Sequence, residues 1–317
     1  MTEPAFVRLN QEKWQRYQEE ASLSGPLKTD TLIANYQDVM ADCAYAQSQF
    51  PGSRVSTYLN QLSTTYYKAI YDKRRLDWRR PLRFFFHDVP LEVAAYRKTI
   101  NITCLIFCLL VAAGCISGIQ DEENIVKTLG SGYVEMTLRN IKQGKPTDVY
   151  SHGSETSSFL SIVWNNLRVD LITYAYGIVP ILGPLYIMKV NGIMLGQFQT
   201  LFFLKGVGLQ SMTAIWIHGT LEMGACVMAC AAAMIFGLGW VFPGTRSRRQ
   251  ALMDSAKSSI RIFVSVLPLT FTAAIFEGFT TRHTEYPLAI KLGIIFGSLL
   301  LLVYYYGILP YRVSHKK

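Results

Sequence analysis

The sequence predicts an all-α polytopic membrane protein with an N-terminal cytoplasmic helical domain. Half of the 317 residues are hydrophobic and only 17% are charged, whereas soluble domains average roughly 25% charged residues. Several apolar runs approach or exceed the roughly 18 residues that a spanning helix needs. Nine Lys/Arg against four acids lie between Lys68 and Lys98, just ahead of the first apolar run, as expected for a cytoplasmic flank.

The charge and cysteine patterns exclude two other classes of protein. The net charge of +9 does not indicate a nucleic-acid partner, because the basic residues gather at membrane flanks without an aromatic-basic readout motif. We expect them to contact membrane lipids. The six cysteines show neither a CxxC pair nor zinc-finger spacing. We therefore interpret them as small residues at helix contacts.

Residues 1–97 are predicted to form the cytoplasmic domain, which ends in a basic juxtamembrane segment. Breaks at Gly25-Pro26 and Pro51-Gly52 separate three helical patterns, the third of which has Tyr58, Leu62 and Tyr66 at helical spacing. Such an aromatic stripe is more typical of a helical core than of a ligand site. No N-terminal signal peptide is expected, since this region is polar.

The transmembrane domain is predicted over residues 98–311. Its six predicted spans cover about 99–119, 167–188, 190–208, 211–241, 260–278 and 292–309. The polar segment 120–157 is expected outside, and the basic tail 312–317 inside, so that both termini are cytoplasmic. Residues 190–241 either cross twice or form a re-entrant pair. Small residues at 190–208 and 224–233 permit tight packing within one chain or in a homo-oligomer.

The most informative motif is the segment Trp216-Ile-His-Gly-Thr-Leu-Glu222, at the start of a long apolar run. His218 and Glu222 are four residues apart and share a helix face. An ionised Glu at the bilayer centre costs roughly 2.5–3.5 kcal/mol, so an ionisable residue within a membrane indicates a functional site. Glu277, at the outer end of the fifth span and followed by Arg282 and His283, is the predicted partner.

Three interpretations of this polar site remain open. In the first, the site is a structural pair that ties a broken helix to its neighbours, and Gly219 allows close approach between the helices. Asn165, Asn166 and Asn191 then form a further structural polar cluster. Alternatively, the site binds a proton, a cation or a polar solute. In the third interpretation, His218 and Glu222 hold zinc for intramembrane hydrolysis. HGTLE supplies only one imidazole and one carboxylate, so the third ligand would be either Glu277 or His283. No cofactor is otherwise predicted, and catalysis is not the favoured activity.

Several sequence pieces occur in the order typical of one known family. They are Phe6-Val7 with Asn10 and Trp14, Tyr58-Leu59-Asn60, Ile70-Tyr71 with Arg74-Arg75, Ser158-Phe159, Asn165-Asn166, Asn191-Gly192, Leu195-Gly196, His218-Gly219, Leu221-Glu222, Phe242-Pro243-Gly244-Thr245 with Ser247-Arg248, and Glu277-Gly278-Phe279 with Thr281-Arg282. Together they cover nearly the whole chain, which resembles the stage II sporulation protein M family, also called DUF95. Tyr67 and Pro184 depart from the family pattern.

The resemblance implies a bacterial cytoplasmic (inner) membrane protein without settled catalytic activity. It implies a membrane scaffold or assembly factor linked to the cell envelope, with envelope or membrane proteins as partners. The partner classes that the resemblance implies are cell-wall hydrolases and the product of a neighbouring gene such as a MoxR-type ATPase. The sequence therefore predicts a scaffold first, an ion- or solute-handling protein second and a metal-dependent hydrolase third.

Overall fold

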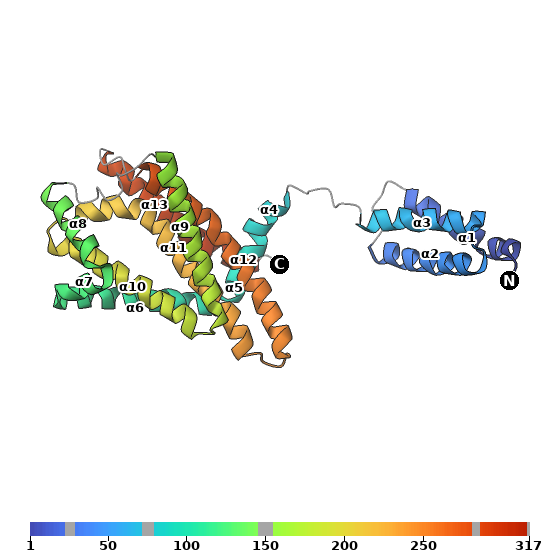
Figure 1. The fold of residues 1–317 in the computed structure, drawn as a ribbon, viewed down its shortest axis with the longest axis horizontal. Coiled ribbons are helices and arrows are strands. Elements are labelled where there is room, and N and C mark those ends of the chain that lie inside the picture. Colours follow the sequence, from blue (N-terminus) through green and yellow to red (C-terminus); the bar gives the residue numbers. More distant parts are fainter. Residues whose placement is uncertain (23–28, 72–78, 145–154, 281–285, 316–317) are drawn as a thin grey trace. The chain divides into compact units, whose positions relative to one another are not determined.

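The computed structural model describes residues 1–22, 29–71, 79–144, 155–280 and 286–315 (Figure 1). All regular secondary structure in these ranges is helical, which confirms the predicted all-α class. The chain divides into two compact units, Met1–Arg80 and Pro81–Lys317. Each unit is described separately below.

The N-terminal unit contains the three predicted helices, α1 (Glu3–Ser22), α2 (Thr29–Gln49) and α3 (Arg54–Tyr71). The aromatic stripe is part of its core, in which Tyr66 is fully buried and donates its hydroxyl to the Tyr17 carbonyl at 2.8 Å. Trp14 donates its indole N–H to Asp42 at 2.8 Å. Polar tips of buried aromatic side chains are thus hydrogen-bonded, as burial requires.

The second unit is a helical bundle preceded by α4 (Arg79–Arg83), which spans the boundary between the units. Its first half contains η1 (Phe84–Asp88), α5 (Val89–Ala95), α6 (Arg97–Gln120), α7 (Glu122–Leu129), α8 (Ser131–Lys142), α9 (Glu155–Ala175) and η3 (Tyr176–Ile178). Its second half contains α10 (Leu182–Leu204), α11 (Gly208–Val241), α12 (Arg248–Ile275), η4 (Phe276–Thr280), α13 (Leu288–Val303), η5 (Tyr304–Ile308) and α14 (Leu309–Ser314).

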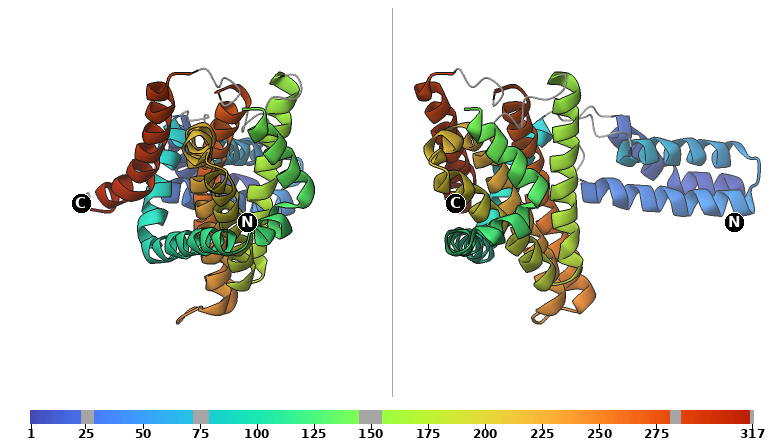
Figure 2. Two further views of the ribbon diagram at one scale, coloured as in Figure 1. Left: turned by 90° about the vertical axis from the view of Figure 1, so that its left-hand side faces the viewer. Right: turned by 60° about the vertical axis from the view of Figure 1, so that its left-hand side comes forward.

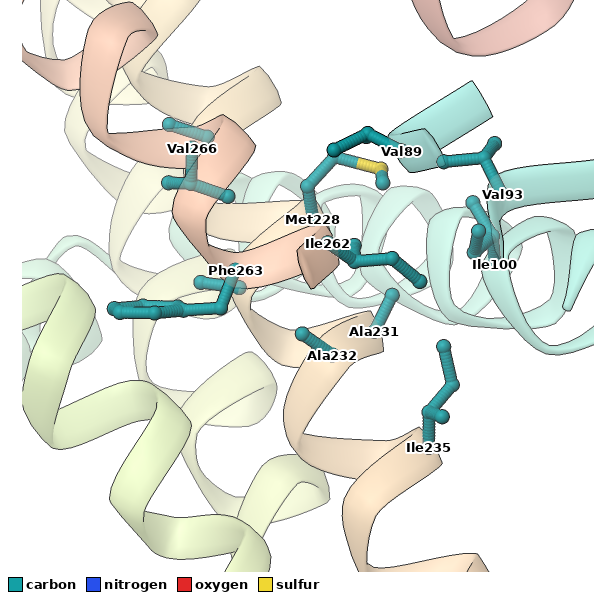
Figure 3. Packing of buried hydrophobic residues seen from close by; sticks show 12 residues of the cluster. Val89, Val93, Ile100, Met228, Ala231, Ala232, Ile235, Ile262, Phe263 and Val266 are labelled. Atoms are coloured by element: carbon teal, nitrogen blue, oxygen red, sulfur yellow. The ribbon is translucent and has the colours of Figure 1, made fainter. Parts of the chain in front are cut away.

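Helix α11 lies at the centre of this unit and packs against α9, α10, α12 and α13 (Figures 1 and 2). Ala231 and Ala232 of α11 are fully buried, beside Ile262 of α12 and Val89 of α5 (Figure 3). Small residues let helix backbones approach closely, which is the main source of packing energy where lipid replaces water. The small residues of 224–233 are therefore used within the chain.

Helices α6 and α10 cross at a pair of glycines. A Cβ on Gly114 would lie 2.8 Å from the Ile193 Cα, and one on Gly196 would lie 2.7 Å from the Cys115 backbone nitrogen. Neither distance leaves room for a methyl group, so the crossing requires glycine on both helices. The thiol of Cys115 also donates to the Gly196 carbonyl at 3.5 Å.

Four helices in the described ranges are long and apolar enough to cross a membrane: Arg97–Gln120, Gly208–Val241, Arg248–Phe279 and Leu288–Ser314. They correspond to the first, fourth, fifth and sixth predicted spans. The bounds predicted for the second and third spans are wrong, because α9 ends at Ala175 and α10 begins at Leu182. Between them lie Pro180, which cannot donate a helical hydrogen bond, and Ile181, which has a φ of 66°.

The segment before α6 also differs from its predicted assignment. Residues 81–97 were assigned from the sequence to the cytoplasmic domain, but they belong to the second compact unit. Val89 and Val93 lie in its core, and Glu92 of α5 forms an ion pair with Arg261 of α12. The backbone of η1 is attached to the same unit, since Tyr305 of η5 donates its hydroxyl to the Phe85 carbonyl at 2.8 Å.

Candidate functional site

His218 and Glu222 lie near the middle of α11, ten and fourteen residues after its first residue, Gly208. At about 1.5 Å of rise per residue, Glu222 is about 21 Å along the helix. His218 is only 3% exposed and Glu222 is partly buried. The spacing of four residues puts both side chains on one face. The pair therefore belongs to the interior of the bundle.

Glu277 reaches the same place from the end of α12. It lies in η4, a single π-helical turn of the kind often found at functional sites. Gly278 of this turn packs against Phe159 of α9, because a Cβ there would lie 3.3 Å from the Phe159 side chain. The potential ligand atoms of His218, Glu222 and Glu277 all lie within 4.8 Å of one another. Two elements distant in sequence thus form one cluster.

A cavity of about 530 Å³ opens beside this cluster. His218 and Glu222 line it, and its other walls come from helices α7 to α10. Among its lining residues are Leu129, Tyr133, Asn165, Leu195 and Phe198. An apolar cavity with a few convergent polar groups is the usual form of a small-ligand site.

Gly219 has a different role from the one that the structural interpretation predicts. A Cβ at Gly219 would meet only Ile215 of its own helix, at 3.8 Å. Gly219 therefore does not serve a close approach between helices. It lines the cavity beside Glu222, where the missing side chain adds room.

The three asparagines of the predicted polar cluster separate in the structure. Asn165 lines the cavity, whereas its neighbour Asn166 is buried. The Asn166 amide lies toward the Glu277 carboxylate, but its Nδ2 forms no hydrogen bond of normal geometry. Asn191 donates to the Ile187 carbonyl of its own helix at 2.9 Å and is not among the residues that line the cavity.

A third buried carboxylate extends the polar region along α9. Asp170, which is 5% exposed, accepts a hydrogen bond from Thr270 of α12. One turn further on, Tyr174 and Ser259 of α12 share a hydrogen bond of 2.8 Å. The Asp170 carboxylate is near enough to Glu222 to repel its charge, as the Glu277 carboxylate also is. Asp170 was not among the residues predicted from the sequence to form the site. The signal was the spacing of four between Asn166, Asp170 and Tyr174, which marks one polar face of a helix.

Arg282 and His283, the other predicted site residues, lie outside the described residues. Chemically, the cluster can hold a proton between its carboxylates, a metal ion through one imidazole and two carboxylates, or a cationic solute from the cavity. Glu277 is the described residue whose carboxylate lies where a third protein ligand, which HGTLE does not supply, would be needed.

Comparison with known protein families gives two matches. The family described as Stage II sporulation protein M matches residues 101–282, which is more than half of the chain and includes the whole cluster. A family described as a domain of unknown function (DUF8413) matches residues 4–72, within the N-terminal unit. The pieces between Phe6 and Tyr71 thus fall in the second match rather than the first. Neither a curated protein nor a solved structure matches the chain.

Proposed function

Because the chain belongs to the stage II sporulation protein M family, we propose that it is a membrane protein of that family that handles a small cation in its transmembrane bundle. The site is the cluster of His218, Glu222 and Glu277. The cation reaches it through the adjacent cavity, in which Glu222 is the acidic residue. This proposal selects the second of the sequence-based interpretations.

The observation that carries the proposal is the convergence of the three side chains within 4.8 Å. Two carboxylates at this separation inside an apolar bundle are costly without a compensating positive charge. A purely structural hydrogen-bonded pair would not require a second acid from another helix. A buried acidic pair open to a cavity supports an exchangeable cation as the occupant.

A flux measurement tests this function directly. The full chain is reconstituted in liposomes that contain a proton-sensitive or a zinc-sensitive dye, and a gradient of the corresponding ion is applied. We expect flux of at least one ion above that of empty liposomes, and at least a tenfold loss in Glu222→Gln and Glu277→Gln. Glu135→Gln is the matched control, since Glu135 is exposed on α8. Equal flux in all liposomes would overturn the proposal.

A scaffold role is a second candidate, and a specific observation favours it. The N-terminal unit has its own core of buried aromatic and aliphatic residues and matches a separate family. A domain with its own core folds as a separate unit, and such a unit can present a docking surface of its own. We infer that envelope or membrane proteins, among them cell-wall hydrolases or a MoxR-type ATPase, are the class of partner that it would recruit.

Site-specific photo-crosslinking in intact cells tests the scaffold role. A crosslinker replaces Leu9, which is 71% exposed on α1, in the full chain. A scaffold gives a discrete adduct that Glu222→Gln leaves unchanged, because the docking module does not depend on the cluster. Absence of a discrete adduct from Leu9 and from Met40, an exposed residue of α2, contradicts the role.

A further inference from the structure

We propose that His218, Glu222 and Glu277 bind one divalent transition-metal ion of the zinc class, with an open coordination position that faces the cavity. This inference rests on the proposed function, since it names the cation of the same site. Four properties of the cluster support it: donor geometry, charge, donor type and surroundings.

The donor geometry is close to that of a metal site. Zinc ligands lie about 2.0–2.2 Å from the ion, which places the donors of a tetrahedral site about 3.3–3.6 Å apart. The donor atoms here lie within 4.8 Å of one another, so they need to move together by about 1.5 Å at most. His218 and Glu222 are fixed on one helix, and we expect rotation of the Glu222 and Glu277 side chains to supply the remaining approach.

The charge of the cluster selects a dication. When both carboxylates are ionised, they and a neutral imidazole carry a charge of −2, which a dication cancels completely. A monovalent ion would leave a net negative charge within the apolar bundle, where an uncompensated charge costs several kcal/mol. Among the described residues that line the cavity there is no Lys or Arg. A bound dication therefore gives the site its most favourable charge state.

The type of donor selects the zinc class among dications. Ca²⁺ takes six to eight oxygen ligands and Mg²⁺ six, and neither favours an imidazole nitrogen. One imidazole with two carboxylates suits Zn²⁺, Fe²⁺ and Mn²⁺. Three protein ligands also leave a position for water, as in catalytic rather than structural zinc sites. Since His218 and Glu222 both line the cavity, this open position faces it.

The surroundings of Glu277 complete the site. Ligating carboxylates usually accept a hydrogen bond from a residue behind them, and loss of that residue lowers metal affinity roughly 10–100-fold. Asn166 is 9% exposed, and its Nδ2 is a buried donor that forms no hydrogen bond of normal geometry. It lies toward Glu277. Asn166 is therefore a positioning residue that holds the Glu277 carboxylate when the metal draws it inward.

Metal content and affinity test the inference. The full chain is purified in detergent, stripped with a chelator, loaded with Zn²⁺ and analysed by elemental mass spectrometry. We expect about one Zn²⁺ per wild-type chain, and loss of binding in His218→Ala, Glu222→Gln and Glu277→Gln. His87→Ala is the matched control, because His87 is exposed on η1, and it should keep the metal. Cobalt substitution should give the visible absorption of four-coordinate Co²⁺.

A second variant keeps the test decisive if a ligand substitution unfolds the protein. Asn166→Ala keeps all three ligands and should bind Zn²⁺ with full stoichiometry but roughly 10–100-fold more weakly. Wild-type protein that takes up no Zn²⁺ after loading overturns the inference, as does unchanged affinity in Glu277→Gln. If metal is absent but proton flux still depends on Glu222, only this inference fails. If zinc binds but no ion moves, only the proposed function fails.

Discussion

Glu277→Gln should change the stability of the second unit (Pro81–Lys317, here the membrane unit) in opposite directions in zinc-free and in zinc-loaded protein. In metal-free protein the substitution removes one of two facing carboxylates. At the outer limit of 4.8 Å and an effective dielectric constant of about 20, two unit charges repel each other by about 3.5 kcal/mol. The variant is therefore more stable than the wild type by about this amount at a pH at which both groups are ionised.

Zinc reverses this order, because it stabilises only the chain that holds it well. A ligand at 1,000 times its dissociation constant adds about 4.1 kcal/mol to the free energy of unfolding. This gain exceeds the repulsion of about 3.5 kcal/mol, so the zinc-loaded wild type becomes the more stable protein. The variant has lost one of three ligands and gains little.

Thermal unfolding in detergent measures the reversal. For a unit of this size, 1 kcal/mol corresponds to a shift in Tm of about 2–4 °C, so the metal-free variant should melt about 7–14 °C above the wild type. The order should invert in saturating zinc. Glu135→Gln, on the exposed side of α8, should show neither effect. The same order of Tm values in chelator and in zinc would refute the reasoning.

Three further predictions concern packing and the N-terminal unit. Gly196→Ala should lower the free energy of unfolding of the membrane unit by about 1–3 kcal/mol through overpacking, measured by thermal unfolding, while Gly297→Ala, which has nothing within 4 Å, should not. Trp14→Phe leaves Asp42 without its indole donor and should cost about 1.5–3 kcal/mol; a wild-type denaturation curve would contradict this. Burial raises the pKa of Tyr66, because the buried side chain favours the neutral phenol. The N-terminal unit therefore keeps the stability that neutral Tyr66 contributes below about pH 10 and loses it as the pH rises through the pKa of the folded state. Near-ultraviolet circular dichroism in a pH titration checks it, and Tyr66→Phe should reduce the transition without abolishing it, because burial also raises the pKa of Tyr17 and Tyr58.

Part of the cluster could be predicted from the sequence, and part of it could not. The spacing of His218 and Glu222 was enough to place them on one face, because four residues make about one helical turn. Glu277 lies 55 positions after Glu222, so its arrival depends on how α12 packs against α11 and on the π-helical turn that ends α12. No local pattern contains that information. The role of Gly219 could not be predicted from the sequence either, since it depends on which residues face Gly219 in the folded chain.

By itself, the sequence determined the helical class, four apolar spans and the three-helix N-terminal region, because apolar content and helical periodicity are local properties of the chain. The tertiary structure alone decided the packing of residues 81–97 in the second unit, the cavity and the convergence of His218, Glu222 and Glu277. The physical reason is distance along the chain: these features arise from contacts between helices that are far apart in sequence, and a helix pattern does not specify which neighbour it will meet.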